Sequence, residues 1–283
     1  MSELRVTREP RSNCKLRAIR LFKWVVLPLA IVFLTEPMYR QHFYDETLSE
    51  APDMQDITKL KAFFENISYL GQPPFILLFY IGTFNLMQKP AALYFWCAMS
   101  FVYFLGNILK SLYAEDRPYW VTDDITATTC HLGFGNPSGH MLNNVFFWLS
   151  LYLHQYYEVG VIKPRMSVFC TAYIIKMAVT CIGITFLIFM GFSRIYLGAH
   201  TFNQVLFGTI LGITLAYIGH YRVKPRFLEM PEKLYEDSTG SKYAVSCMSY
   251  IKVIAFALLL PIAVAACVLL AQEGSLRAFY HSN

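Results

Sequence analysis

Long stretches without a charged residue constrain this chain more than any other feature of its sequence. Five of them contain no Asp, Glu, Lys or Arg, and they cover 66–88, 90–109, 141–157, 201–221 and 253–272. Each is close to the ~20 residues that an α-helix needs to cross the hydrocarbon core of a bilayer. Only 15% of the residues are charged, against about 25% in soluble domains. The sequence therefore indicates an integral membrane protein and excludes soluble, fibrous, disordered and disulfide-scaffold classes.

The apolar stretches predict an all-α protein with about seven transmembrane helices. We expect these spans at 21–35, 74–88, 90–109, 141–157, 168–192, 203–221 and 252–271. The first is interpreted as an uncleaved anchor, because no small-x-small cleavage site follows it. Residues 1–20 are then a basic cytosolic leader, and residues 21–283 form one polytopic membrane domain. Residues 36–65 are polar and mostly acidic, and we expect a loop there with a short interfacial helix.

The distribution of basic residues predicts which loops face the cytosol, since cytosolic loops are enriched in Lys and Arg. Span parity places many of them opposite the 110–140 loop, namely Lys89, Lys163, Arg165, Arg222, Lys224, Arg226, Lys233 and Lys242. We therefore expect the 110–140 loop and the 193–202 turn to face the lumen or the exterior. The sequon Asn66-Ile67-Ser68 lies on the same expected face. The expected location is the endoplasmic reticulum or another endomembrane, with the plasma membrane as the alternative.

The charge distribution argues against a nucleic-acid partner, and the cysteine spacing argues against disulfide and metal-binding frameworks. The formal net charge is +5, but the positive residues do not gather into one patch interleaved with aromatics, so no nucleic-acid partner is expected. The seven cysteines are too scattered for a disulfide framework or a metal-binding CxxC pair. Membrane lipids are the expected surroundings, and no particular oligomeric state is indicated.

Three polar clusters stand out at the expected membrane boundary. The first is Lys110 and Arg117, which are seven residues apart, so that two helical turns would place both cations on nearly one helix face. The last of the three along the chain is Ser193-Arg194 with His200, in the turn between the fifth and sixth spans. Snorkelling of basic side chains and a helix-end hydrogen bond are the structural alternatives for these two clusters.

The second cluster, Asn136-Pro137-Ser138-Gly139-His140, directly precedes the fourth span. Asn136 suits a helix N-cap and Pro137 the first helical position. Ser138, Gly139 and His140 would then lie in the first turn, where backbone N–H groups lack partners and the helix dipole favours an anion. An ordinary capped helix start is the alternative reading.

Together the clusters supply the groups that phosphoryl transfer needs. The three cations and the amides of the 138–140 turn suit the equatorial oxygens of a phosphoryl group. The two histidines remain for the chemistry, one to attack phosphorus and one to protonate the leaving oxygen. No carboxylate cluster of the kind that holds magnesium accompanies them, so we expect no metal and no cofactor.

These residues also carry a family resemblance. Lys110-x6-Arg117-Pro118, Pro137-Ser138-Gly139-His140 and Ser193-Arg194-x5-His200 together resemble the three-part motif of the type 2 phosphatidic acid phosphatase (PAP2) superfamily. The match covers 110–204 and includes the number of spans between the motifs. It implies a six-helix core, to which this chain would add one helix.

The resemblance also implies a role for each motif residue. His200 would be the nucleophile that forms a phosphohistidine, and His140 the general acid. The phosphate would be held by Lys110, Arg117, Ser138, Gly139 and Arg194. Many members place an Asp four residues after the nucleophile to orient its imidazole, whereas this chain has Gln204, which can accept a hydrogen bond but adds no charge.

The motif fixes the reaction better than the substrate. A lipid phosphate, such as phosphatidate or a sphingoid-base phosphate, is the first expectation, and a sugar phosphate is the alternative. Glucose-6-phosphatases are similar in the 117–120 and 193–200 segments and in having glutamine at position 204. A different class of function, a non-catalytic transporter or scaffold on the same fold, is motivated by Lys176 within the fifth span.

Overall fold

The computed structural model describes residues 19–72, 89–126, 133–157 and 166–229, with five further positions between 73 and 88. Nearly all of the leader, most of the expected span at 74–88, the whole of that at 252–271 and the side chain of Lys176 lie outside the described residues. The transporter hypothesis based on Lys176 is therefore not tested.

Every regular element in these described ranges is a helix. In chain order they are the π-helical turn η1 (Phe22–Val26), α2 (Leu27–Gln55), the 3-10 turn η2 (Thr58–Leu60), α3 (Lys61–Leu70), α5 (Lys89–Tyr113), α6 (Pro118–Val121), α7 (Gly139–Tyr157), α8 (Met166–Tyr196), α9 (Phe202–Ile218) and the π-helical turn η4 (Gly219–Val223). Within the part of the chain that the structure describes, four helical segments are long and apolar enough to span a membrane: Ile19–Gln55, Pro90–Val121, Met177–Tyr196 and Phe202–Glu229. The expected all-helical membrane class is confirmed, while the count of seven spans stays a prediction.

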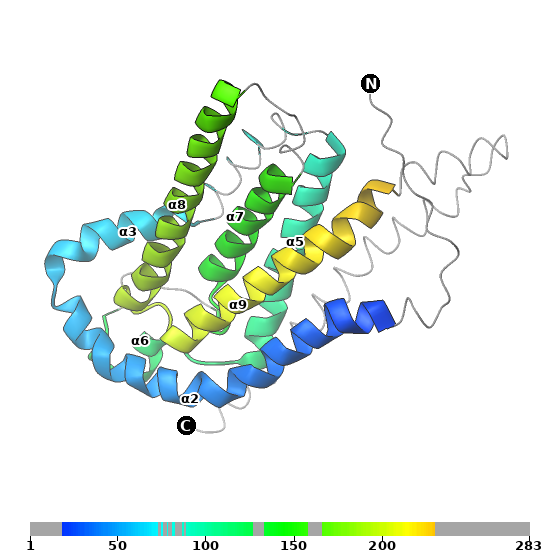
Figure 1. The fold of residues 1–283 in the computed structure, drawn as a ribbon. Helices are drawn as coiled ribbons and strands as arrows, with labels where there is room; N and C mark the ends of the chain where they lie inside the picture. Colours follow the sequence, from blue (N-terminus) through cyan, green and yellow to red (C-terminus); the bar gives the residue numbers. More distant parts are fainter. Residues whose placement is uncertain are drawn as a thin grey trace.

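Helix α7 packs against α5, α8 and α9 (Figure 1). The approach of α9 to α7 is close because glycines face it: a Cβ on Gly208 would lie 2.7 Å from the carbonyl oxygen of Ser138, and one on Gly212 3.0 Å from that of Leu142. Small residues allow such close helix packing in membranes. The main core cluster includes Val102, Leu142, Phe146, Phe147, Phe207 and Leu211. This packing holds the N-terminus of α7 beside the start of α9.

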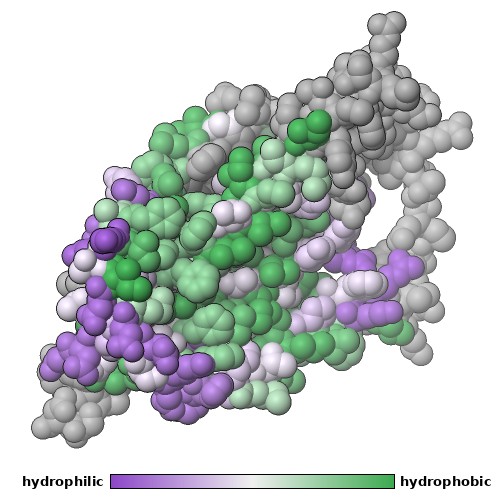
Figure 2. All heavy atoms as spheres, turned by 60° about the vertical axis from the view of Figure 1, so that its left-hand side comes forward, coloured by the Kyte–Doolittle hydropathy of each residue, from purple (hydrophilic) through white to green (hydrophobic). Residues whose placement is uncertain are grey.

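The outer surface of the bundle is apolar where it would meet lipid. On α8, Ile174, Ile182 and Ile188 are more than half exposed. Figure 2 shows hydrophobic side chains over the middle of this face and hydrophilic ones gathered towards its edges. Such a continuous apolar surface is unfavourable in water and suits a bilayer.

The expectation of a loop over 36–65 is wrong for most of that segment, because α2 continues to Gln55 and α3 follows. Polar residues of α2 pair with each other one turn apart. Arg40 donates two hydrogen bonds to the fully buried Glu36, and Gln41 donates to Asp45. These polar side chains lower the hydropathy of the segment, but pairing between positions i and i+4 satisfies their hydrogen-bonding groups within a helix.

The C-terminal half of α2 curves around the end of the bundle where α8 ends and α9 begins (Figure 1). Proline inside the helix, at positions 37 and 52, accounts for departures from a straight path. Thr47 accepts a hydrogen bond from the backbone N–H of Phe202 at 2.9 Å, and Gln55 donates one to the carbonyl of Tyr196 at 2.9 Å. The polar half of α2 is thereby fixed to the segment that joins α8 and α9.

Candidate active site

His200 lies in the turn between α8 and α9, at the end of the bundle where α5 ends and α7 begins, and is 2% exposed. Burial lowers the pKa of His200 well below its usual value, and the charges of Arg117, Arg194, Lys110 and His140 lower it further. The three sequence clusters thus meet around one imidazole. This imidazole is neutral at pH 7, so one ring nitrogen carries a lone pair.

The turn that presents His200 depends on a glycine. Helix α8 ends at Tyr196, and Gly198 follows with φ of 65°, in the left-handed region that side chains disfavour. The backbone N–H groups of Ala199 and His200 both donate to the carbonyl of Arg194 at 3.1 Å. The reversal places His200 directly over the end of the helix that carries Arg194.

Arg117 is 2% exposed and fixed by a fork of hydrogen bonds. Its Nε donates to the carbonyl of Gly133 at 2.6 Å, its Nη1 to that of Ala199 at 2.7 Å and its Nη2 to that of Phe134 at 3.3 Å. The same Nη1 lies 3.4 Å from Nε2 of His200. The guanidinium therefore stands beside the nitrogen that would attack phosphorus.

Lys110 and Arg117 do not share one helix face, contrary to the prediction from their spacing. Helix α5 ends at Tyr113, Ala114 has a φ of 45°, and Arg117 is the residue that precedes α6. The left-handed residue reverses the chain between them, so that Arg117 does not lie on the helix that carries Lys110. Their proximity comes from this reversal and not from helical periodicity.

Gln204 holds the imidazole of His200 in one orientation. Its Oε1 lies 3.1 Å from Nδ1 of His200 and accepts the backbone N–H of Thr201 at 3.3 Å, which closes the capping box of α9. Because an amide oxygen can only accept, Nδ1 must carry the hydrogen. The lone pair is then on Nε2, next to Arg117.

The predicted N-cap at Asn136 is wrong, because α7 begins at Gly139. Ser138 precedes the helix, and its carbonyl accepts the N–H of Leu142 at 2.9 Å. The side chain of Asn136 is bound elsewhere, since its Nδ2 donates to Glu115 at 2.6 Å and to Glu36 at 2.9 Å. The helix therefore starts two residues later than that cap implied.

The turn at 138–140 retains the features of an anion site. Ser138 is fully buried, and its hydroxyl has no hydrogen-bond partner among the described residues. A Cβ on Gly139 would lie 3.6 Å from Nζ of Lys110, so glycine leaves space between the helix start and the ammonium. First-turn N–H groups lack intrahelical partners and attract anions.

Arg194 is 1% exposed, and its Nη1 donates to the hydroxyl of Ser68 on α3. In the sequence Ser68 stands out only as part of a sequon, which gives no indication of this contact. Asn66 of the sequon is exposed, whereas Ser68 is buried. Helix α3 thus helps to hold Arg194 near His200.

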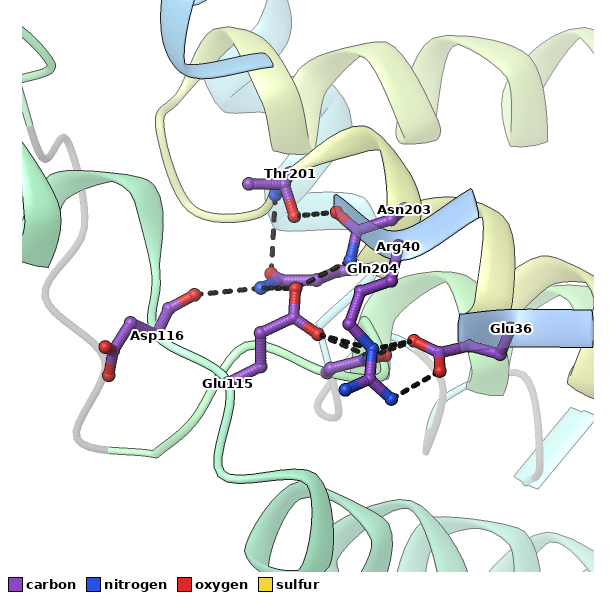
Figure 3. Close-up of polar contacts among 8 residues, drawn as sticks. Glu36, Arg40, Glu115, Asp116, Thr201, Asn203 and Gln204 are labelled. Carbon is purple, nitrogen blue, oxygen red and sulfur yellow. Dashed lines mark hydrogen bonds and ion pairs between the residues drawn. The ribbon is translucent and has the colours of Figure 1, made fainter. Parts of the chain in front are cut away.

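A buried polar network behind His200 was also missed (Figure 3). It joins α2, the segment after α5, the segment before α7 and the start of α9 through Glu36, Arg40, Glu115, Asn136, Asn203 and Gln204. One signal for it was present in the sequence, because a carboxylate near an apolar span, such as Glu36, requires a partner.

The described residues include no three His, Cys, Asp or Glu placed to hold a metal ion, and the metal-free mechanism stays a prediction.

Gly135 provides the sharpest structural test of the Gln204 contact. A Cβ on Gly135 would overlap the side-chain amide of Gln204. We expect Gly135→Ala to displace this amide and to lower kcat for phosphate release about 100-fold, the cost of misplacing a reacting group by about 1 Å. Gly183→Ala on α8 is the control, because its Cβ would make only ordinary contacts with Trp148. Equal activity of the two variants would show that Gln204 does not orient His200.

Known proteins share sequence similarity with this chain. Residues 91–228 match the model of the PAP2 superfamily. The chain is 25% identical over 171 residues to human glucose-6-phosphatase 3, covering 56% of this chain and 47% of that protein. It is 29% identical over 197 residues to lipid phosphate phosphatase delta of Arabidopsis thaliana, covering 66% and 42%. The chain thus spans less than half the length of these curated relatives.

A solved structure has the same fold. It is a transmembrane PAP2-type phosphatidylglycerolphosphate phosphatase from Bacillus subtilis, with a TM-score of 0.56 and 21% identity, covering 69% of this chain and 92% of that one. All eight predicted site residues, His200 and Gln204 included, lie within 91–228. Residues 91–228, which carry these motifs, thus match the PAP2 superfamily, and the chain shares its fold with a PAP2-type phosphatase.

Proposed function

We propose that this protein is an integral-membrane phosphatase that hydrolyses a lipid phosphate monoester through a phosphohistidine at the lumenal or outer face of the membrane. The observation that carries the proposal is the placement of Nε2 of His200. This atom lies 3.4 Å from Nη1 of Arg117, while Nδ1 is bound to Gln204. A neutral imidazole with its lone pair beside a fixed cation is prepared to attack an anion.

The first step forms a covalent intermediate. Nε2 of His200 attacks phosphorus, the bond between phosphorus and the ester oxygen breaks, and His140 gives its proton to the leaving alcohol. Arg117, Arg194 and Lys110 stabilise the charge on the three equatorial oxygens, together with the hydroxyl of Ser138 and the first-turn amide of Gly139. The products of this step are the alcohol and an N-phosphorylated His200.

The second step regenerates the enzyme. His140, now neutral, accepts a proton from water as the water oxygen attacks phosphorus. The bond from phosphorus to Nε2 then breaks, and inorganic phosphate leaves. His200 keeps the proton on Nδ1 throughout, because Gln204 presents only an acceptor to that nitrogen.

The distribution of charge supports the proposed side of the membrane. Arg222 and Arg226 lie near the end of α9 remote from His200, and the positive-inside bias favours the cytosol for that end. His200 then faces the lumen or the exterior. Endomembranes, and the endoplasmic reticulum first, are the proposed location.

Two substrate classes have specific support. The relationship to lipid phosphate phosphatase delta and the fold shared with the phosphatidylglycerolphosphate phosphatase favour a lipid ester. The relationship to glucose-6-phosphatase 3, and the glutamine at position 204, favour a sugar phosphate as the second candidate. Both esters present the same dianionic group to the cations around His200.

A substrate panel tests the proposal. The full chain, purified in detergent, is assayed for phosphate release from phosphatidate, a sphingoid-base phosphate, a polyprenyl diphosphate and glucose 6-phosphate, each with and without a chelator. We expect a lipid ester to give the highest kcat/KM and the chelator to have no effect. Dominant turnover of glucose 6-phosphate would replace the lipid assignment by the sugar one, and loss of activity in chelator would contradict the metal-free mechanism.

A further inference from the structure

Among the described residues no carboxylate contacts His200 directly, but the carboxylate of Glu115 binds Gln204, the hydrogen-bond partner of His200. Nε2 of Gln204 donates to Oε1 of Glu115 at 3.3 Å and to the backbone carbonyl of Asp116 at 2.9 Å (Figure 3). On the other side of the same amide, Oε1 faces Nδ1 of His200 at 3.1 Å. Glu115, Gln204 and His200 therefore form a continuous chain of hydrogen bonds.

The surroundings of Glu115 are those of an ionised carboxylate. Nδ2 of Asn203 donates to its Oε1 at 2.6 Å, and Nδ2 of Asn136 donates to its Oε2 at 2.6 Å. Nε of Arg40 lies 3.9 Å from Oε2. Every one of these groups, and Gln204 as well, can only donate to Glu115. Three amide N–H groups and a nearby guanidinium all stabilise the negative charge of this carboxylate.

The two acceptors decide which way the amide of Gln204 points. Both the carboxylate of Glu115 and the carbonyl of Asp116 require a donor, so they bind the NH₂ group. The amide oxygen is then turned towards His200 and the N–H of Thr201. A reversed amide would place its oxygen against two acceptors and its NH₂ group against the N–H of Thr201.

The backbone around Glu115 is built to hold it there. Ala114 adopts a φ of 45°, in the left-handed region that residues other than glycine disfavour. The backbone carbonyl of Glu115 accepts the N–H of Gly135 at 2.8 Å. Strain of this kind persists only where the surrounding contacts determine the conformation.

We propose that Glu115 is a positioning residue that acts on His200 through Gln204, an inference that rests on the proposed phosphatase function. It fixes the amide of Gln204, and thereby keeps the proton of His200 on Nδ1 and the lone pair on Nε2. It also supplies the negative charge that Gln204 lacks. In relatives with an aspartate at position 204, one residue would do what Glu115 and Gln204 do together in this chain.

This charge matters in the attacking step. When Nε2 forms its bond to phosphorus, the imidazole acquires positive charge while Nδ1 keeps its hydrogen. The hydrogen bond from Nδ1 to Gln204 strengthens, and so does that from Gln204 to Glu115, because such bonds polarise each other in a buried site. No proton moves to Glu115. The carboxylate stabilises the charged ring through one intervening amide.

The first test is Glu115→Gln, which keeps the shape and removes the charge. We expect kcat for the best substrate of the panel to fall about 10- to 100-fold, the range typical of groups that orient a histidine from its far side. KM should change by less than about threefold, because the phosphate-binding cations are untouched. Asp123→Asn is the matched control, since Asp123 is exposed in the loop that follows α6. We expect it to retain wild-type kcat.

The second test is a double-mutant cycle, in which the effect of Glu115→Gln on kcat should change sign when position 204 carries an aspartate. Gln204→Asp places a carboxylate next to His200 but also next to Glu115, so we expect reduced activity from like-charge repulsion. Adding Glu115→Gln to this variant removes the repulsion and should raise kcat severalfold, although the same change lowers kcat in the wild type. A merely structural role of Glu115 would lower kcat in both backgrounds.

The outcomes separate this inference from the proposed function. A wild-type protein that releases phosphate from no substrate of the panel overturns both. An active wild type with unchanged kcat in Glu115→Gln, or an equal loss of kcat on adding Glu115→Gln to either background, overturns only the role of Glu115. If Glu115→Gln alone does not fold, the comparison of Gln204→Asp with the double variant still decides by its sign.

Discussion

His200→Ala is expected to abolish phosphate release, with a fall in kcat of at least about 10⁴-fold, as for other enzymes that lose a covalent nucleophile. The reason is structural as well as chemical. The imidazole is buried and held between Gln204 and Arg117, and neither an amide nor a guanidinium can replace Nε2 as a nucleophile. The measurement is phosphate release by the purified full chain with the best substrate of the panel.

A control and a second readout make this prediction specific. His42 on α2 is largely exposed, so His42→Ala should retain wild-type activity. Rapid quenching with a substrate labelled in phosphorus should trap an acid-labile label on the wild type and none on His200→Ala. A label that persists in the variant would assign the nucleophile to another residue, and full activity would refute the mechanism.

Arg117→Lys is expected to give the second largest effect, a fall in kcat/KM of about 100- to 1000-fold, the typical cost of losing one preorganised donor to the developing oxyanion. Lysine keeps the charge but cannot form the fork that joins Gly133, Phe134 and Ala199. Nη1 beside His200 would be lost, and the carbonyls would lose their donor. Steady-state kinetics measure the change.

The stability of the same variant should also fall. A buried carbonyl that loses its donor costs about 1–3 kcal/mol, so thermal unfolding in detergent should occur at a lower temperature. Arg226→Lys is the matched control, because Arg226 is exposed at the far end of the bundle. Wild-type kcat/KM in Arg117→Lys would mean that a point charge suffices there and that the fork has no catalytic role.

Local pattern predicted the membrane-spanning helices well and failed where polar residues pair over one helical turn. The apolar stretches at 90–109 and 203–221 lie within helical segments suited to a bilayer. Residues 36–55 were expected to be a loop because they are polar, yet Glu36 and Arg40 satisfy each other within α2. Hydropathy measures the cost of transferring a side chain alone, and pairing changes that cost.

The motifs indicated which side chains to look for, but helical arithmetic misplaced two of them. Lys110 and Arg117 were expected on one helix face, and Asn136 was expected to cap α7. The left-handed Ala114 ends α5 between the two cations, and Asn136 binds Glu36 and Glu115 instead. Neither outcome follows from spacing, because each depends on contacts with residues far away in the chain.

The sequence by itself determined the class of protein and the chemistry it carries: apolar stretches long enough to span a membrane, two histidines and three cations in the order of the PAP2 motifs. These are properties of composition and local order, which survive without knowledge of the fold. Only the tertiary structure decided what stands behind His200. Glu115 and Gln204 are 89 positions apart, and Glu36 and Asn136 are 100 apart, so chain reversal and helix packing had to bring them together.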